Sequence, residues 1–387
     1  MKILRVITRL NIGGPSHQAQ HLHLEFSRRG HDCTLVHGPV GSGEGDHRFL
    51  DDKGVISLSN LTQPIRPLKD LSCLKQMVKL LTSEPYDILH THTAKAGLLG
   101  RLAALIAKSK RLKKGFPRLK VIHTYHGHVF RGYFGPLMTK LILSVERWLS
   151  RHTDHLITLS PTLAQEISTY LNTRQDRMEI VPLGLHLLPY VASDLSTEFN
   201  QRFKADKTHW IGWVGRMTQI KNPKGLLKIA SHMKKLNPMV GFVMVGDGPL
   251  RTEVQRKIQE LNLEDCVFLT GWEKDMSNMI PSFGALINTS FNEGTPVAIL
   301  EALASGTPVL CTDVGGSHDI LPKGEPVAVY RAGEEENQIQ ILLKWLNEKN
   351  RVSTSARNHI ANHYSVERLA ADLSTIYATI SYPEDSP

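Results

Sequence analysis

The chain alternates short apolar runs with amphipathic segments, and this pattern occurs twice. In the first half, six runs read as β-strands, at residues 2–8, 33–38, 87–92, 120–125, 154–160 and 178–184. Between them, apolar residues recur at intervals of three and four, which indicates helices at 17–30, 71–84 and 95–110. A βα repeat of this kind predicts a parallel sheet that helices cover on both faces.

A second series of strands follows an interruption. The pattern lapses between residues 184 and 207, and strands are expected again at 209–215, 240–246, 266–271, 284–290, 308–313 and 326–331. We therefore predict an α/β protein with two Rossmann-like, parallel-sheet domains. The expected divisions are an N-terminal domain at 1–187, a linker at 188–207, a C-terminal domain at 208–365 and a helix at 366–380 that crosses back toward the N-terminal domain.

Length and cysteine usage agree with two globular domains in a reducing compartment. A chain of 387 residues fits about two domains. The four cysteines lie far apart without a CxxC pair, so neither a disulfide framework nor a zinc knuckle is expected. The opening MKILRVITRL is too short and too soon interrupted by arginine for a signal peptide, and no stretch approaches the roughly 18 apolar residues of a spanning helix. These features predict a cytoplasmic protein.

The excess of basic residues favours anionic partners. The formal net charge is +9 and the pI is about 9.3, which suits phosphorylated small molecules, an acidic membrane surface or nucleic acid. The basic stretch at 108–120 has few aromatic residues for stacking bases, so we expect no nucleic-acid partner. Segments 95–114 and 133–151 combine apolar faces with lysine and arginine. They predict peripheral contact with an anionic membrane, and ordinary core-facing helices are the alternative.

The first strand is followed by a glycine turn that could bind an anion. Gly13 and Gly14 allow close backbone approach, and Pro15 suits a first helical turn. The turn is not a GxGxxG, and no acidic ribose ligand follows about twenty residues later, so a dinucleotide fingerprint is absent. An ordinary tight turn remains an equal alternative.

The second domain opens with HWIGWVGRMTQIKNPKG, in which a strand runs into Gly215. Arg216 follows directly, and Lys221 comes five residues later, just before a helix. Two cations beside a glycine turn can neutralise a diphosphate, arginine through a bidentate fork and lysine as a point charge. Two solvated surface cations are the alternative.

Two glutamates bracket the start of a short apolar helix in FNEGTPVAILEALASG. Thr295 is expected to cap this helix and Pro296 to be its first residue. Glu293 then lies in the loop, where it can accept hydrogen bonds from hydroxyl groups. Glu301 lies among alanine, isoleucine and leucine, where an ionised carboxylate is costly unless it is hydrogen-bonded. A ribose diol could supply that bond, whereas a capping acid and a salt-bridged core acid are the alternative.

Taken together, these motifs resemble a known family. The E-x7-E arrangement within 291–316, preceded by GRMTQIKNPKG, MVGDGPLRTEV and FLTGW, is similar to that of the retaining glycosyltransferases of family 4. The resemblance covers essentially the whole chain and is strongest from Trp213 to Gly316. It implies the GT-B fold, in which two Rossmann-like domains face an inter-domain cleft.

The resemblance also implies roles for individual residues. Arg216 and Lys221 would clamp the donor diphosphate, Glu301 would bind the ribose, and Glu293 would bind hydroxyls of the donor sugar. His126, in VIHTYHG, matches a histidine that lies beside the donor sugar in the family. The implied catalytic residues are Glu293, His126, Arg216 and Lys221, and the implied donor-binding residues are Gly14, Arg216, Lys221, Gly294, Thr295, Pro296, Val297 and Glu301.

The implied chemistry needs neither a metal nor a cofactor, because preorganised cations and helix amides can stabilise the departing nucleotide diphosphate. Family members retain the anomeric configuration, either by front-face attack or through a covalent bond to Glu293. A metal site at His90 and His92, with His123, His126 and His128 nearby in order, is an alternative, but no carboxylate or cysteine completes it.

The expected activity is transfer of a hexose or N-acetylhexosamine from a nucleotide sugar, most simply a UDP-sugar, to a glycan or polyprenyl-diphosphate-linked acceptor in cell-surface polysaccharide assembly. A sugar-nucleotide epimerase or phosphorylase of the same fold, a non-catalytic nucleotide-sugar binder and a basic nucleic-acid-binding module are the competing interpretations.

Overall fold

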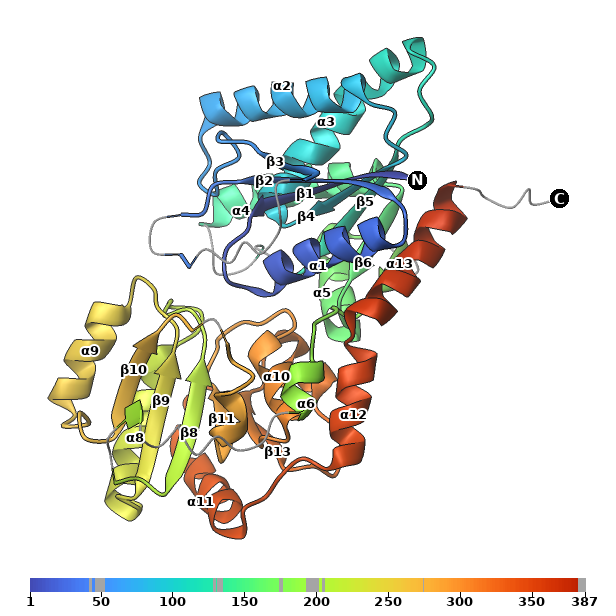
Figure 1. Ribbon diagram of the computed structural model, residues 1–387. Helices are drawn as coiled ribbons and strands as arrows, with labels where there is room; N and C mark the ends of the chain where they lie inside the picture. The colour runs from blue at the N-terminus through green and yellow to red at the C-terminus, as the bar shows by residue number, and fades with distance from the viewer. Residues whose placement is uncertain are drawn as a thin grey trace. The chain divides into compact units, whose positions relative to one another are not determined.

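The computed structural model divides into two compact units. It describes residues 1–41, 44–45, 53–127, 130, 135–173, 177–192, 202–203, 206–273 and 275–381. The N-terminal unit comprises Met1–Leu185 and Ser365–Pro387, and the C-terminal unit comprises His186–Tyr364. Each unit is built on its own parallel sheet (Figure 1). The predicted α/β fold with two Rossmann-like domains is confirmed.

The N-terminal unit contains a seven-stranded sheet in the order β3-β2-β1-β4-β5-β6-β7. Every neighbouring pair is parallel. The order reverses between β1 and β4, which creates a switch point at the carboxyl ends of these strands. The strands are β1 (Lys2–Arg9), β2 (Asp32–Gly38), β3 (Val55–Ser57), β4 (Ile88–His92), β5 (Lys120–Tyr125), β6 (His155–Thr158) and β7 (Met178–Ile180).

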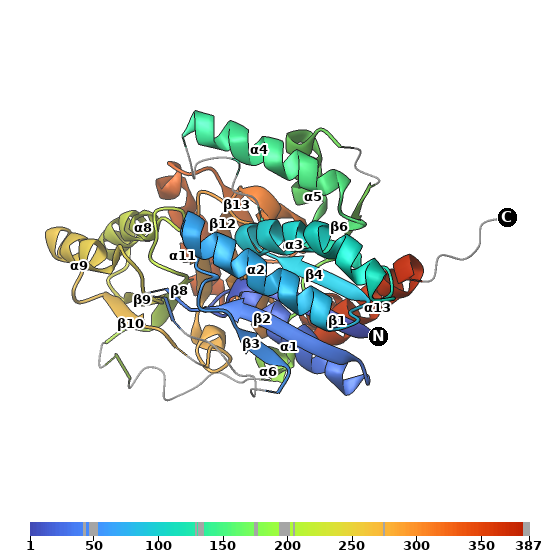
Figure 2. The ribbon, with the colours of Figure 1, turned by 90° about the horizontal axis from the view of Figure 1, so that it is seen from above.

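Helices cover both faces of this sheet, as a parallel sheet requires. Figure 2 shows α2, α3 and α4 in succession across it. On the opposite face, the C-terminal helix α13 packs beside α1. The helices of the unit are α1 (Gly14–Arg28), α2 (Pro67–Ser83), α3 (Ala94–Lys113), α4 (Pro136–Arg151), α5 (Pro161–Leu171) and α13 (Val366–Ser381).

The side chains of neighbouring residues in a strand point to opposite faces of the sheet and join different apolar clusters. Leu4 and Leu89 join the cluster formed with α2 and α3. Ile3 and Ile88 join the cluster formed with α1 and α13. This alternation explains why the strands read as unbroken apolar runs, because a strand with helices on both sides buries every side chain.

The C-terminal unit contains a six-stranded sheet in the order β10-β9-β8-β11-β12-β13. All its neighbouring pairs are parallel, and the order reverses between β8 and β11. The strands are β8 (His209–Val214), β9 (Val240–Val245), β10 (Val267–Gly271), β11 (Ala285–Asn288), β12 (Val309–Thr312) and β13 (Val327–Tyr330).

The helices of the C-terminal unit form two groups. α8, α9 and α11 pack with the strands in one apolar cluster. The short helices α6 and α10 pack with α12 in the second group. The helices are α6 (Leu188–Ala192), α8 (Pro223–Leu236), α9 (Arg251–Glu260), η2 (Ile280–Ser282), α10 (Val297–Ser305), η3 (Gly315–Ile320), η4 (Glu335–Gln338), α11 (Ile339–Glu348) and α12 (Thr354–His363).

Two features of the N-terminal unit differ from the sequence-based expectation. β3, of three half-exposed residues, was not expected, because so short a segment carries no readable period. Of the two segments predicted to contact a membrane, α3 is a core helix whose small residues are buried against the sheet. α4, by contrast, buries only Glu146, Leu149 and Ser150 among its described residues.

Two further observations concern cysteines and membrane helices. All four cysteines are free and buried. Among the described residues, none of the helices combines the length and apolarity that crossing a bilayer requires.

Candidate active site

The candidate site in the C-terminal unit lies at the switch point of the six-stranded sheet. The loop after β8 carries Arg216 and Lys221, and the loop after β11 carries Glu293. Because β8 and β11 are parallel neighbours, their carboxyl ends open at the same edge of the sheet. The loops that the sequence separates by about seventy residues therefore meet.

Three hydrogen bonds hold these two loops together. The Thr289 hydroxyl donates to the backbone oxygens of Lys221, at 3.1 Å, and Asn222, at 2.7 Å. The backbone N–H of Phe291 donates to the oxygen of Ile220 at 2.7 Å. The loops that carry Lys221 and Glu293 are thus joined by hydrogen bonds to the backbone, in addition to the contact between the two side chains.

Glu293 is the centre of this site. Its carboxylate accepts hydrogen bonds from Lys221 Nζ, at 2.5 Å to Oε1 and 2.7 Å to Oε2. Oε1 also accepts from the Ser290 hydroxyl at 2.6 Å and from Asn288 Nδ2 at 3.0 Å. The side chain is 6% exposed, and that of Lys221 is 30% exposed. One face of the pair is therefore open to an incoming group.

The contacts determine the charge of Glu293. Burial opposes ionisation of its carboxyl group, but the ammonium of Lys221 and the hydrogen bonds from Ser290 and Asn288 hold its pKa below the usual value. Glu293 is therefore a carboxylate at neutral pH. An ammonium has three N–H donors. The two that face Glu293 leave a third for an anion on the exposed side.

The loop after β8 also packs closely on the loop after β9. The N–H of Gly215 donates to the oxygen of Val245 at 3.0 Å, and the N–H of Met217 donates to Asp247 at 2.8 Å. Gly246 has a φ of +124°, and a Cβ there would lie 2.1 Å from the oxygen of Gly215. Gly246, the first glycine of MVGDGP, is therefore required, because the backbone next to Arg216 lies too close to leave room for a side chain.

The start of α10 differs from the predicted cap. The helix begins at Val297, Pro296 occupies the cap position, and no side chain caps it. Among the described residues, the hydroxyl of Thr295 is buried and has no hydrogen-bond partner. Thr295 is therefore not the cap, because Pro296 has an extended ψ of 107° and ends the loop one residue later than expected. The first-turn amides of α10 lack a side-chain cap and can bind an anion.

A second glycine turn supports this loop. Gly315 has a φ of +50°, and a Cβ at this position would lie 1.9 Å from the oxygen of Glu293. The N–H of Gly316 donates to the oxygen of Gly294 at 3.1 Å. The carbonyl oxygen of Gly294 is therefore held by the start of η3.

Glu301 occupies a different environment, one turn inside α10. Its Oε1 accepts a hydrogen bond of 2.9 Å from the hydroxyl of Tyr190, in α6. Burial raises the pKa of Glu301 to about 7, and this single neutral donor lowers it only in part. Burial also raises the pKa of Tyr190, whose hydroxyl therefore keeps its proton.

Arg357, in α12, fastens α6 to α10. Its Nη2 donates to the oxygen of Val191 at 2.6 Å, and its Nε donates to the oxygen of Ala304 at 3.1 Å. One guanidinium thus joins the last turns of both short helices. Tyr190 is held over Glu301 by this bridge.

In the N-terminal unit, the predicted residues also lie at the carboxyl edge of the sheet. Gly14 is the first residue of α1, which has no side-chain cap. His126 directly follows β5, and its Nε2 lies 2.9 Å from Nδ1 of His92. Burial lowers the pKa of His126 to about 3 and that of His92 well below its usual value. Both imidazoles are therefore neutral at pH 7, and one donates its proton to the other.

His90, two residues before His92, is committed to the core. Its Nδ1 lies 2.6 Å from the Tyr377 hydroxyl of α13, and its Nε2 lies 2.7 Å from the Thr124 hydroxyl. Both ring nitrogens are therefore hydrogen-bonded.

Within the described part of the chain, no group of three histidine, cysteine or acidic side chains is arranged to hold a metal ion. His128, considered with this cluster, lies outside the described residues.

Three residues of the site were not found from the sequence: Asn288, Ser290 and Tyr190. Asn288 and Ser290 carried a usable signal, because polar residues at the end of a buried strand face the carboxyl edge of a parallel sheet. Tyr190 carried none, because its segment lacks a period and its partner Glu301 is 111 residues away.

Two family matches account for most of the chain. The family described as "Glycosyltransferase Family 4" matches residues 12–187, and the one described as "Glycosyl transferases group 1" matches residues 195–363. This chain belongs to the family 4 type of GT-B glycosyltransferases. The fold and enzyme class that the E-x7-E resemblance implied are thereby confirmed.

The names of two similar proteins agree with this assignment. The chain is 27% identical over 341 residues to the UDP-Gal:alpha-D-GlcNAc-diphosphoundecaprenol alpha-1,3-galactosyltransferase of Escherichia coli, with 85% of each chain covered. It is 25% identical over 302 residues to the putative glycosyltransferase EpsD of Bacillus subtilis, with 76% of each chain covered.

Solved structures share the fold at lower identity. The structure of Anabaena HepE, in complex with UDP and glucose, superposes with a TM-score of 0.80 at 19% identity, covering 98% of this chain and 100% of HepE. Sucrose-phosphate synthase of Thermosynechococcus elongatus gives a TM-score of 0.77 at 18% identity, covering 98% and 99%.

Proposed function

We propose that this glycosyltransferase moves a hexose or N-acetylhexosamine, with retention, from a UDP-sugar to a glycan or polyprenyl-diphosphate-linked acceptor in cell-surface polysaccharide assembly. The name of the Escherichia coli relative, which specifies a UDP-galactose donor and a diphosphoundecaprenol acceptor, supports this choice. So does the presence of UDP in the structure of HepE.

The observation that carries the proposal is the Lys221–Glu293 pair at the switch point of the C-terminal sheet. Its carboxylate and ammonium present adjacent opposite charges at an opening of the site. A nucleotide sugar has the matching chemistry, because a hydroxyl-bearing sugar is joined directly to an anionic diphosphate. Glu293 would accept hydrogen bonds from the sugar, and Lys221 would donate its third N–H to the diphosphate.

Departure of the diphosphate would be the step that the site accelerates. Negative charge grows on the leaving phosphate, and fixed positive groups stabilise it without reorganising. Lys221, Arg216 and the backbone N–H groups of Gly294, Thr295 and Val297 would supply those groups, and Pro296, which has no N–H, would only shape the turn. Gly14 would bring a second helix start toward the same phosphates, as the family resemblance implies.

Glu293 is better suited to binding than to attack. Three donors already hold its carboxylate, and each hydrogen bond reduces the basicity of the oxygen that accepts it. We therefore favour front-face attack by the acceptor hydroxyl over a covalent sugar on Glu293. His126 would act beside the donor sugar as a neutral hydrogen-bonding group, because its pKa is about 3.

We also propose that the reaction is independent of divalent metal, since Arg216 and Lys221 carry the charge that a metal would otherwise supply. An unchanged transfer rate after chelation with EDTA is the expected result. A rate restored only by added Mg²⁺ or Mn²⁺ would contradict it.

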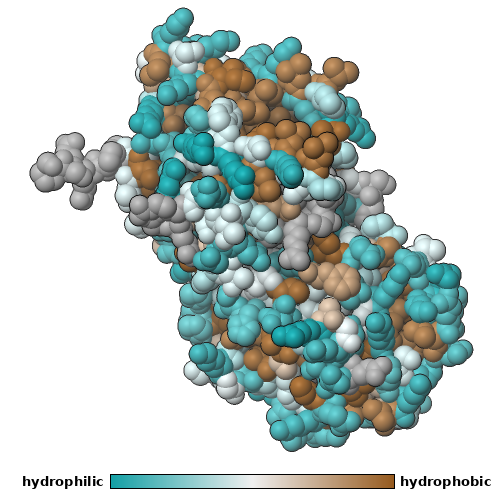
Figure 3. All heavy atoms as spheres, turned by 180° about the vertical axis from the view of Figure 1, so that it is seen from behind, coloured by the Kyte–Doolittle hydropathy of each residue, from teal (hydrophilic) through white to brown (hydrophobic). Residues whose placement is uncertain are grey.

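Helix α4 is proposed to hold the enzyme against the inner face of an anionic membrane. Leu137, Leu141 and Trp148 lie within about 40° on one face of the helix. They are 83%, 58% and 45% exposed. Lys140 and Arg151 flank that face. Figure 3 shows apolar side chains gathered on this side of the N-terminal unit. An apolar stripe beside basic residues is typical of an interfacial helix.

Membrane contact can be tested by sedimentation with vesicles. The wild-type protein should sediment with vesicles that contain anionic lipid, and the double variant Leu137→Glu, Leu141→Glu should remain in the supernatant. Equal sedimentation of both proteins would remove α4 from the contact.

The transferase proposal is tested first by donor binding. UDP and UDP-sugars should raise the melting temperature, and GDP and ADP should not, because a ligand that binds only the folded state stabilises it. Labelled sugar should then pass to a polyprenyl-diphosphate-linked acceptor, and Glu301→Ala and Arg216→Ala should each abolish most of that transfer. Wild-type rates in both variants would refute the assignment, and conversion of the UDP-sugar without an acceptor would indicate an epimerase.

A further inference from the structure

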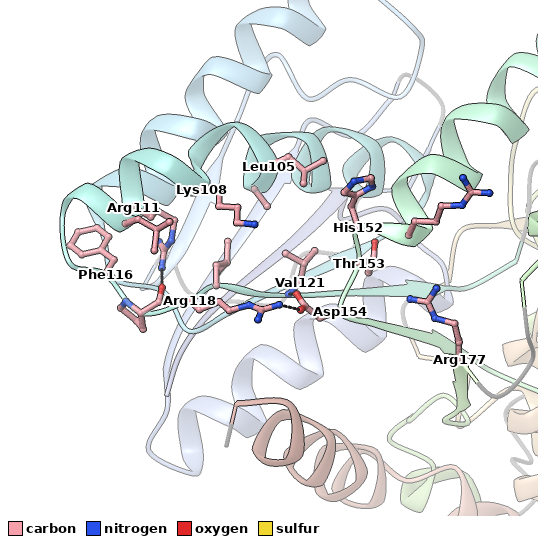
Figure 4. A pocket seen from close by; sticks show the side chains of 15 residues that line it. Leu105, Lys108, Arg111, Phe116, Arg118, Val121, His152, Thr153, Asp154 and Arg177 are labelled. Carbon is pink, nitrogen blue, oxygen red and sulfur yellow. Dashed lines mark hydrogen bonds and ion pairs between the residues drawn. The ribbon is translucent and has the colours of Figure 1, made fainter. Parts of the chain in front are cut away.

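A second binding pocket lies in the N-terminal unit, at the edge of the sheet opposite to the candidate site. It has a volume of about 550 Å³. Its walls are the C-terminal half of α3, the residues that precede β5 and β6, the end of α4 and Arg177, which precedes β7 (Figure 4). Residues that precede parallel strands lie at the amino edge, whereas Gly14, His92 and His126 follow their strands. The pocket is therefore separate from the predicted donor site.

The pocket carries an excess of positive charge. Lys108, Arg151 and Arg177 line it, and none of them has an acidic partner within the described part of the chain. The single carboxylate in the lining, Asp154, accepts from Arg118 Nη2 at 3.1 Å and from the backbone N–H of Val121 at 2.9 Å. In Figure 4, Lys108 points from α3 toward the strand ends, and Arg118 and Arg177 approach from the strands.

Arg111, which also lines the pocket, is structural. Its guanidinium is buried and donates to four backbone oxygens, those of Leu81, Glu84, Tyr86 and Pro117. It fixes the end of α3 and the loop before β5, so the wall of the pocket is rigid. The exposed cations at the rim, Lys108, Arg151 and Arg177, are the ones available to a ligand.

The floor of the pocket is apolar. Leu105, Leu112, Phe116 and Leu119 line it beside the cations. Leu112 is 63% exposed, so this large apolar side chain is in contact with water unless a ligand covers it. The pocket lies next to α4, because His152 lines it and the ring of His152 packs with its centroid 4.7 Å from that of Trp148.

We propose that this pocket binds a phosphate group carried on an apolar chain, which is the headgroup region of an anionic phospholipid. Arginine pairs bidentately with phosphate oxygens and lysine adds a point charge, so Arg151, Arg177 and Lys108 match the headgroup. Leu105, Leu112 and Phe116 match the first part of the chain. The inference stands apart from the donor site, since none of the residues proposed to bind the donor lines this pocket.

The test uses a short-chain lipid that stays monomeric. Binding of dihexanoyl phosphatidate to the full chain is measured by titration calorimetry and compared with binding of inorganic phosphate and of dihexanoyl phosphatidylcholine. We expect one site for the phosphatidate, roughly tenfold weaker binding of phosphate because the apolar contacts are lost, and no binding of the zwitterionic lipid.

Variants locate the site. Arg151→Ala and Arg177→Ala should each weaken phosphatidate binding about tenfold, because each removes a charge-assisted contact. Lys75→Ala is the matched control: Lys75 is an exposed cation on α2 of the same unit, outside the pocket. The three positions are exposed, so the melting temperature should not change.

Each other outcome overturns the proposal in a defined way. If inorganic phosphate binds as tightly as phosphatidate, the pocket is a simple anion site to which its apolar residues contribute no affinity. Equal losses in Arg151→Ala, Arg177→Ala and Lys75→Ala would show attraction to the whole basic surface. No binding of phosphatidate at low salt would exclude the lipid site.

Discussion

The loop before α10 and the interior of α10 each hold one glutamate, and the pKa values of the two carboxyl groups shift in opposite directions. Glu293 receives a cation and two neutral donors, and its pKa falls. Among the described residues, Glu301 receives a hydrogen bond from the Tyr190 hydroxyl alone, and burial raises its pKa to about 7. Burial acts in the same direction on both. The difference shows that the supply of donors, rather than depth, decides which carboxyl group is ionised.

This difference suits two tasks in one donor site. A carboxylate that is always ionised gives a fixed acceptor beside the reacting sugar and the leaving diphosphate. A carboxyl group near its pKa lacks a strong partner until hydroxyls arrive, so its best hydrogen bonds form only with ligand bound. The following predictions test whether the two glutamates differ in this way.

The largest effect is expected from Lys221→Met, which leaves the Glu293 carboxylate without its cation. We expect at least a hundredfold loss of transfer, because a charge-stabilising contact to the diphosphate is also lost. Stability should fall by about 1 to 3 kcal/mol, since the partly open pair is less costly to break than a fully buried one. Enzyme assay and thermal unfolding measure the two effects.

Lys224→Met is the matched control for that variant. Lys224 lies three residues away and pairs with Glu253, but both side chains are exposed, at 41% and 38%. Surface pairs of this kind contribute little. Transfer and stability close to wild type are expected, and equal losses in the two variants would mean that any nearby cation serves.

Glu301→Gln should separate stability from function. A carboxyl group whose pKa is raised from 4.5 to about 7 by folding favours the folded state below pH 4.5 and loses that advantage as the pH rises through 7. Removing the group should therefore increase stability at pH 8 by roughly 1 to 3 kcal/mol. Affinity for a UDP-sugar should nevertheless fall ten- to a hundredfold, because an amide accepts ribose hydrogen bonds more weakly than a carboxylate.

A gain in affinity at pH 8 would contradict the ribose role of Glu301. A loss of stability at pH 8 would instead mean that the ionised group has a partner in the folded protein beyond Tyr190.

The pH dependence of donor binding should come from Glu301 alone. If the ribose prefers the ionised form, affinity for UDP-glucose rises about tenfold between pH 6 and pH 8, following the pKa of about 7. UDP-glucose is preferred to UDP because its diester phosphates do not titrate in this range. Tyr190, Asp275 and Arg357 are the ionisable neighbours of this region, and Tyr190 keeps its proton throughout.

The same titration in Glu301→Gln provides the control. Its affinity should not vary between pH 6 and pH 8. A persistent slope would assign the titration to another group.

The fold was predictable, and so was the place of the candidate site residues after strands, since both depend on local signals. A strand such as β9 is an apolar run, and Arg216, Lys221, Glu293 and Glu301 stand in loops or helix starts that follow strands. β3 was missed because three half-exposed residues give no period. The cap of α10 was misplaced because Pro296, with its extended ψ, takes the cap position itself.

The pairing of residues was not predictable, because it depends on which strands become neighbours. Lys221 and Glu293 are 72 residues apart and meet only because β8 and β11 are adjacent at the switch point. Their direct contact changes the interpretation of Lys221, which serves Glu293 as well as an expected diphosphate. The contact between Tyr190 and Glu301 depends in addition on Arg357, whose hydrogen bonds join α6 to α10.

The smallest predicted effect concerns Tyr190→Phe, which removes the one donor that Glu301 has in the described part of the chain and keeps the ring. Loss of one neutral hydrogen bond should weaken UDP-glucose binding about threefold at pH 7, because the carboxyl group loses its orientation and its pKa rises further. The midpoint of the pH dependence should move upward, a change that a purely structural role would not produce. Tyr330→Phe is the control, since the Tyr330 hydroxyl is buried without a partner among the described residues, and its removal should leave binding and midpoint unchanged. A midpoint unmoved in Tyr190→Phe would show that burial alone fixes the state of Glu301, and the contrast with Glu293 would then depend on Lys221 only.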